Sequence, residues 1–135
     1  MDIKDAQKQV GEFTKERAWD IIMPSQRMVH LTREVGKLSE YLLFTEGVTT
    51  KSIEEKKLPK QVGDVFFSLL ALANLLNIDI GEQLKEAMRQ DAIKYPAEET
   101  RKAALKAYAE QTKPYFDKLS PKWLEAKTFL RDFWV

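Results

Sequence analysis

The stretch 65-VFFSLLALANLL-76 decides the fold, because only Ser68 and Asn74 interrupt its run of apolar side chains. A helix of this composition is apolar on nearly every side, and such helices are buried at the centre of a protein. Pro59 suits the first turn of a helix, so we expect the helix to run from about Pro59 to Leu76. The other helices are expected to pack around it.

Two helical patterns precede this stretch. Asp2 is a good N-cap, so the first helix is expected from Asp2 to about Arg17. A second helix is expected from about Ser25 to Phe44, with Gly47 as its stop. Apolar residues recur at helical spacing in both: Ile3, Ala6, Val10 and Phe13 in the first, and Met28, Leu31, Val35, Leu38 and Leu42 in the second.

Further helices are predicted after the central one. Asp79 is the N-cap expected for a fourth helix that ends near Tyr95, before Pro96. Residues 97–119 have a weaker helical pattern, interrupted near Pro114, and a last helix is expected from Ser120. That helix carries the aromatic and aliphatic residues Trp123, Leu124, Phe129, Leu130, Phe133 and Trp134. We therefore predict an all-α four-helix bundle over residues 1–98. Residues 99–135 are a C-terminal helical extension that packs on the same domain or on a second subunit.

Composition excludes several classes of function. With 135 residues, of which 44% are hydrophobic and 32% charged, the chain is long enough for one soluble globular domain. The 22 basic and 21 acidic residues nearly cancel, which argues against binding to nucleic acid or to an acidic membrane. No cysteine is present and His30 is the single histidine, so thiol chemistry and histidine-rich metal sites are not expected. The polar start MDIKDAQK does not resemble a signal peptide, so a cytoplasmic protein is expected.

Two polar stripes lie beside the apolar seams of the second and third helices. The first contains His30, Glu34, Lys37 and Tyr41, and the second contains Gln61, Asp64 and Ser68. Residues three or four apart share one face of a helix, so each stripe is continuous. A buried polar group without a partner costs about 1–3 kcal/mol. The two stripes are therefore either each other's partners across an antiparallel helix pair or simply the solvent edges of the two helices.

Four segments carry a resemblance to a known family. The segments 30-HLTREVGKLSEYL-42 and 58-LPKQVGDVFFSLLALANLLNIDI-80 resemble the MazG-like all-α nucleoside triphosphate pyrophosphohydrolases, in particular the small dCTPase-like branch. The segment 13-FTKERAWD-20 is similar to the end of that family's first helix, and 89-RQDAIKYPAEE-99 to the basic end of its fourth. The resemblance covers roughly residues 1–100. It implies hydrolysis of a nucleoside triphosphate to the monophosphate and pyrophosphate with Mg²⁺ (or Mn²⁺), by a homodimer or homotetramer.

The resemblance also implies a metal site, from which this sequence departs at two positions. Members of the family carry E-x-x-E on the second helix and E-x-x-D on the third, and these four carboxylates hold the metal. Here the motifs read Glu34 to Lys37 and Gln61 to Asp64. Glu34 and Asp64 match the ligands, whereas Lys37 and Gln61 replace carboxylates. Glu40 is a stand-in ligand only if it can reach the site, and it lies off the Glu34 face.

These substitutions suggest a hypothesis for Lys37. Its ammonium group would neutralise Glu34 and Asp64 in place of a metal and donate to the Gln61 carbonyl. Natural divergence and alteration of an active parent explain such a change equally well. The predicted function is a pyrophosphohydrolase scaffold impaired at the metal site. The alternatives are a catalytically silent nucleotide-binding protein and an oligomeric structural or interaction module.

Five further residues are predicted to contact nucleotide by the same resemblance: Trp19, His30, Arg89, Lys94 and Tyr95. Each also has a structural interpretation. Cations at the end of a helix offset its dipole, a tryptophan after a first helix is commonly a core residue, and His30 suits a structural hydrogen bond. Asp91 stands where the family often has asparagine, which weakens the prediction for the end of the fourth helix.

Overall fold

The computed structural model describes residues 1–47 and 57–116, and within these ranges every regular element is a helix. The predicted all-α class is therefore confirmed. The helices are α1 (Ile3–Glu16), α2 (Pro24–Thr45), α3 (Lys57–Leu75), α4 (Ile80–Lys94) and α5 (Ala97–Phe116), in that order along the chain. The helix predicted from Ser120 lies outside the described residues.

Local chemistry sets most helix ends, as predicted. The Asp2 carboxylate accepts from the backbone N–H of Asp5 at 2.8 Å, and the Asp79 carboxylate accepts from that of Glu82 at 3.1 Å. Pro24 is the first residue of α2, where its missing N–H removes no helical hydrogen bond. Gly47 has a φ of 76°, which only glycine adopts without a steric cost, so it ends α2.

Two other helix ends use the left-handed conformation without glycine. Ala18 follows α1 with a φ of 55°, and Asn77 follows α3 with a φ of 54°. At both ends the next residue donates its N–H back into the helix, from Trp19 to the Thr14 carbonyl and from Ile78 to that of Ala73, each at 2.9 Å. Asparagine tolerates this conformation better than alanine does. The turn after α1 is thus strained at Ala18.

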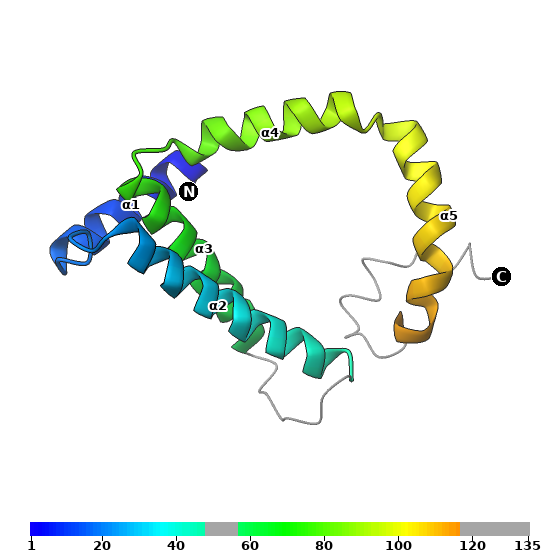
Figure 1. Cartoon of the computed structure of the whole chain (residues 1–135), viewed down its shortest axis with the longest axis horizontal. Helices are drawn as coiled ribbons and strands as arrows, with labels where there is room; N and C mark the ends of the chain where they lie inside the picture. Colours follow the sequence, from blue (N-terminus) through cyan, green and yellow to red (C-terminus); the bar gives the residue numbers. More distant parts are fainter. Residues whose placement is uncertain (48–56, 117–135) are drawn as a thin grey trace.

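Helix α3 packs on both α1 and α2, and it runs antiparallel to α2 (Figure 1). It holds Leu70, which is 2% exposed, together with the buried residues Ala71 and Ala73. Phe67 meets Phe13 of α1 edge to face, with ring centroids 5.7 Å apart. The Asn74 amide donates to the Gln7 carbonyl at 3.0 Å, which joins α3 to α1 a second time. The prediction that the third helix is central is confirmed.

The predicted apolar seam of α2 is only partly buried. Leu31 is 8% exposed, but Met28 is 48% and Val35 is 43% exposed. Among the described residues α2 packs mainly on α3, so these two side chains flank the contact instead of filling it. Helix α3 has an exposed apolar stripe of its own, formed by Val62, Phe66 and Leu69.

Within the described residues, helix α4 is joined to the three-helix unit near its start. Gln7 of α1 accepts from the Ile80 N–H at 3.1 Å and donates to the Ile78 carbonyl at 2.6 Å. From there α4 leads away from α2 and α3 (Figure 1), and it contains no buried residue. Helix α5 continues through Pro114 to Phe116, so the interruption predicted near Pro114 is wrong. Pro114 stands in the last turn of α5. Its missing backbone N–H removes one helical hydrogen bond there without ending the helix.

No single helix among the described residues has both the length and the apolar composition to cross a membrane, although α3 and α4 pass that test as a pair bent by 104°.

Candidate functional site

The two polar stripes meet at one point, between Glu34 on α2 and Gln61 on α3. The Gln61 side-chain amide donates to the Glu34 carboxylate at 2.7 Å and to the Glu34 backbone carbonyl at 2.9 Å. Gln61 is 5% exposed and the Glu34 side chain is 21% exposed, so the contact is buried on the Gln61 side and only partly buried on the Glu34 side. The antiparallel packing of α2 and α3 brings together two residues that are 27 positions apart in the sequence. One of the two interpretations of the stripes, mutual partners across a helix pair, therefore holds for this pair.

Lys37 forms an ion pair with Glu34, one of the two carboxylates that match the ligands of the family. Its ammonium nitrogen lies 3.5 Å from the second carboxylate oxygen of Glu34, one helical turn away on α2. The Lys37 side chain is 42% exposed and that of Glu34 is 21% exposed, so solvent screens this pair in part. Each carboxylate oxygen of Glu34 thus has a partner: the Gln61 amide donates to one, and the Lys37 ammonium group forms an ion pair with the other.

Asp64 has a different cation from the one predicted. Lys60, four residues earlier on α3, lies 3.0 Å from the Asp64 carboxylate. This hydrogen bond, and then the charge of Asp64, raises the pKa of Lys60. The predicted network, with Lys37 bridging Glu34 and Asp64, is therefore split into two pairs. The reason is local, since Lys60 and Asp64 share one face of α3 and need no tertiary contact to meet.

The hydrogen-bond partner of Gln61 also differs from the hypothesis. Lys37 was expected to donate to the Gln61 carbonyl, but the Gln61 NH₂ group is the donor and Glu34 is the acceptor. A carboxylate can only accept, so the amide nitrogen is the atom that must face it. The group therefore contains two carboxylates, two ammonium groups and a buried amide donor, with no net charge.

This donor set does not fit Mg²⁺ or Mn²⁺. Hard divalent cations need several anionic or neutral oxygen ligands that converge on one point. Among the residues that the structure describes, no three Asp, Glu or His side chains are close enough to hold a metal ion. The position of Gln61 presents N–H groups toward Glu34, and the carboxylates of Glu34 and Asp64 each have a lysine partner.

A comparison with known proteins supplies a relative. Over 90 residues, which are 65% of this chain and 81% of the relative, the sequence is 30% identical to a Bacillus subtilis (strain 168) protein named "Uncharacterized protein YpjD". The chain belongs to the YpjD family. No family model matches the sequence, and no solved structure matches it either. The name of YpjD states no activity, so membership in the YpjD family assigns a relationship and not a reaction.

In this member of the YpjD family, the predicted nucleotide contacts fall into two groups. Trp19 and His30 line a common cavity of about 290 Å³ with Ala18, Ile22 and Arg27, at the end of α2 opposite Lys37. Trp19 is 47% exposed and packs edge to face on Phe13, with centroids 6.0 Å apart. Trp19 is therefore half-exposed, with one side of its ring packed on Phe13.

The second group lies on α4, apart from Glu34 and Gln61 (Figure 1). Arg89 forms two hydrogen bonds to Glu86, at 2.7 and 2.9 Å, and this contact raises the pKa of Arg89. The Lys94 ammonium group lies 5.2 Å from the centre of the Tyr95 ring. Within one chain these three residues do not join the α2–α3 group, because α4 leads away from it.

Sequence reasoning missed Arg27. It is 7% exposed, which is unusual for arginine, and burial lowers its pKa. A signal was present, since Arg27 stands one helical turn before Leu31 on the face of α2 that packs on α3. A charged residue in such a position needs partners, and identifying them required the tertiary structure.

Proposed function

We propose that this protein is a MazG-like nucleotide pyrophosphohydrolase scaffold whose metal site has been replaced by a neutral network of side chains. The hydrolysis of nucleoside triphosphates to monophosphate and pyrophosphate is then strongly impaired. The single observation that supports this most directly is the buried hydrogen bond of 2.7 Å between the Gln61 amide and Glu34. It stands where the family resemblance implies two carboxylates that share a metal.

The charge balance supports impairment. Four carboxylates without a cation would repel one another, and metal binding relieves that repulsion. Here Glu34 is neutralised by Lys37, and Asp64 by Lys60. A divalent cation would have to displace both ammonium groups and the Gln61 donor, without gaining the two missing carboxylates. The protein therefore has a stable apo site and little affinity for Mg²⁺ or Mn²⁺.

The test is restoration of the missing carboxylates. We would measure pyrophosphate release from a panel of dNTPs and NTPs with Mg²⁺ or Mn²⁺, for the natural chain and for the double variant Lys37→Glu, Gln61→Glu. We expect no turnover by the natural chain and measurable turnover by the double variant. Thermal unfolding with and without the metal would be measured beside it, because the new carboxylates should destabilise the apo protein and the metal should restore its stability.

A matched control carries the same change in charge elsewhere. Lys8 and Gln9 are exposed on α1, so Lys8→Glu, Gln9→Glu should give neither turnover nor stabilisation by metal. Turnover by the natural chain would overturn the proposed impairment. A folded double variant that shows no turnover and no stabilisation by metal would overturn the pyrophosphohydrolase scaffold and leave a silent binding protein or an assembly module.

We further propose that a second copy covers the exposed stripe of α3, in a homodimer or homotetramer. Val62, Phe66 and Leu69 are 52%, 41% and 39% exposed, which is unusual for neighbouring apolar residues on a central helix. Beside them, a Cβ added at Gly63 would meet nothing within 4 Å. Light scattering would show the mass, and Val62→Glu should lower it. Val29→Glu, on α2 and 69% exposed, is the control that should leave the mass unchanged.

A further inference from the structure

An apolar groove lies between α1 and α3. It has a volume of about 420 Å³, and among the described residues Gln9 is its single polar lining side chain. Phe13 of α1 and Phe66 of α3 both line it, and each is 41% exposed. Gly63 lines it as well, and a Cβ added there would meet nothing within 4 Å. The groove is therefore an open apolar surface with room for side chains from another segment.

The edge of α1 that borders this groove is acidic. Asp5, Glu12 and Glu16 share the helix face of Gln9, since they stand four residues before it and three and seven residues after it. All three are exposed. Neither Asp5 nor Glu12 forms an ion pair with a residue in the described part of the chain. A segment that packs in the groove therefore meets unpaired carboxylates on its α1 side.

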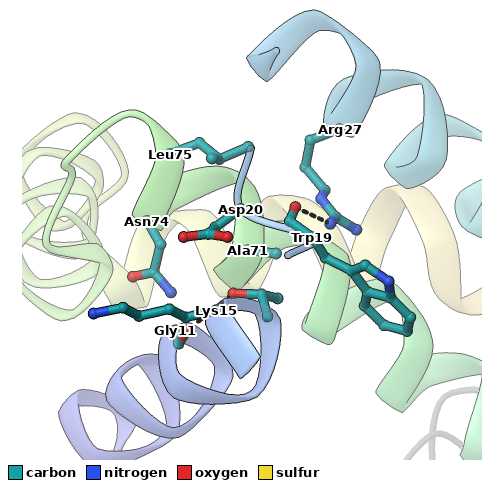
Figure 2. A pocket seen from close by; sticks show the side chains of 9 residues that line it. Gly11, Lys15, Trp19, Asp20, Arg27, Ala71, Asn74 and Leu75 are labelled. Atoms are coloured by element: carbon teal, nitrogen blue, oxygen red, sulfur yellow. Dashed lines mark hydrogen bonds between the residues drawn. The ribbon is translucent and has the colours of Figure 1, made fainter. Parts of the chain in front are cut away.

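The opposite edge of α1 has the reverse charge. The lysines Lys4, Lys8 and Lys15 are exposed there. Lys15 lines a separate polar pocket together with Arg27 and Asn74 (Figure 2). The acidic charge is thus confined to the groove side of α1. Charge complementarity selects partners, so the groove favours an amphipathic helix that carries cations beside its apolar face.

Residues 120–135, which lie outside the described ranges, have the sequence of such a helix. Four side chains fall on one apolar face at helical spacing: Trp123, Ala126, Leu130 and Phe133. The cations of Lys122 and Lys127 border that face. The carboxylates of Glu125 and Asp132 fall on the opposite side. The sequence therefore combines an apolar face with cations at its borders.

We propose that residues 120–135 of a second copy bind this groove as an amphipathic helix, with the bordering lysines toward the acidic edge of α1. Such a helix would be about 24 Å long, close to the roughly 21 Å of the 14-residue α1. Within one chain α4 and α5 lead away from α1 and α3 (Figure 1), so α5 ends apart from its own groove. The proposal rests on the homo-oligomer proposed above. It names the segment that covers Phe66, which belongs both to the groove and to the exposed stripe of α3.

Cross-linking tests this contact directly, because the chain has no natural cysteine. A Gln9→Cys chain and a Val135→Cys chain would be refolded together from urea, treated with a short bismaleimide and analysed by mass spectrometry. A link between residues 9 and 135 in this mixture can form only between two copies. We expect such links in the mixture. From a chain that carries both cysteines we expect covalent dimers instead of cross-linked monomers.

Filling the groove provides a matched comparison. Gly63→Phe places a side chain in the groove, and Gly36→Phe places the same side chain on α2, where an added Cβ also meets nothing within 4 Å. In the Gln9→Cys chain, Gly63→Phe should lower the yield of links to residue 135 about tenfold, the effect of one lost anchoring contact. Gly36→Phe should leave the yield unchanged. Glu12→Lys should lower the yield as well, whereas Glu82→Lys, exposed on α4, should not.

Light scattering of the natural chain separates this proposal from the homo-oligomer on which it rests. An oligomer without links between residues 9 and 135 would overturn the docking of residues 120–135 and leave the oligomer standing. A monomer would overturn both. Equal losses in Gly63→Phe and Gly36→Phe, or links within single chains, would also overturn the docking. None of these results bears on the pyrophosphohydrolase scaffold, which turnover tests separately.

Discussion

Gln61 on α3 and Gln90 on α4 donate the same kind of hydrogen bond, from a side-chain amide to a glutamate, in two different settings. Gln61 is 5% exposed and donates at 2.7 Å to Glu34 on another helix. Gln90 is exposed and donates at 2.8 Å to Glu86, four residues earlier on its own helix. Contacts between helices join α1, α2 and α3, whereas the side-chain hydrogen bonds described within α4 link residues three or four positions apart. We therefore expect these two hydrogen bonds of similar length to contribute differently to stability.

The largest expected difference comes from placing a carboxylate at each position. Gln61→Glu puts a second carboxylate against Glu34 in a buried contact, and we expect it to lower the free energy of unfolding at neutral pH by about 2–3 kcal/mol. Gln90→Glu creates an exposed like-charge pair one turn apart, with an expected loss of about 0.5 kcal/mol or less. Urea denaturation of the two variants beside the natural chain measures both values.

The pH dependence of stability separates the effect of charge from that of packing in the Gln61→Glu variant. Burial and the nearby Glu34 raise the folded-state pKa of the carboxyl introduced by Gln61→Glu, so the variant binds more protons folded than unfolded. Its deficit should therefore grow as pH rises through the ordinary glutamate range and shrink as pH falls below that range. A deficit that stays constant with pH would show that lost packing, and not charge, destabilises the variant.

Truncation of the two glutamines is the next largest contrast. Gln61→Ala removes both hydrogen bonds to Glu34 and leaves a small cavity, so we expect a loss of about 2 kcal/mol. Gln90→Ala should change stability by no more than about 0.5 kcal/mol, since the site is exposed and alanine is a good helix former. Similar losses at the two positions would mean that Gln90 is covered, for example by a second copy of the chain.

How far the sequence predicts this molecule depends on whether a feature is local. The helix starts at Asp2 and Asp79 follow from the hydrogen-bonding needs of a first turn, and they were predicted correctly. The position of α3 at the centre follows from its apolar composition. The exposure of Met28 and Val35 was not predictable, because periodicity identifies an apolar face without showing which helix covers it.

The candidate site shows the same limit. Residue spacing along the two helices predicted that Glu34 and Gln61 could meet, and they do. The sequence analysis assigned Asp64 to Lys37 and missed its ion pair with Lys60. The four-residue spacing of Lys60 and Asp64 made that local pair predictable. The Arg27 pocket depends on the strained turn at Ala18, which places the Trp19 carbonyl beside the guanidinium. No pattern in the sequence gives that geometry.

Lys37 tests whether the α2–α3 group depends on its ion pair or on its hydrogen bonds. Lys37→Met keeps the aliphatic part of the side chain and removes the charge. Because Lys37 is 42% exposed, we expect a loss of less than about 1 kcal/mol in urea denaturation, smaller than that of Gln61→Ala. Added salt should reduce this difference further. A loss larger than that of Gln61→Ala would show that the Lys37–Glu34 ion pair stabilises the α2–α3 contact more than the Gln61 hydrogen bonds do.

The smallest expected effect belongs to Glu86, the partner of Gln90. Its hydrogen bonds from Arg89 and then from Gln90 hold the pKa of Glu86 below its ordinary value of 4.5. A lowered pKa means that the contribution to stability is present at neutral pH and is lost as pH falls through the folded-state value. The protection of the α4 amides, measured as the exchange rate relative to the intrinsic rate at each pH, should therefore fall in acid in the natural chain, and Glu86→Gln should remove that dependence on pH. Amides of α3 around Gln61 should respond equally in the two proteins, because among the described residues Glu86 accepts hydrogen bonds from Arg89 and Gln90 of its own helix. A matching change in α3 would show that the two regions are energetically coupled. The local contacts of α4 would then not be independent of the contacts between α2 and α3.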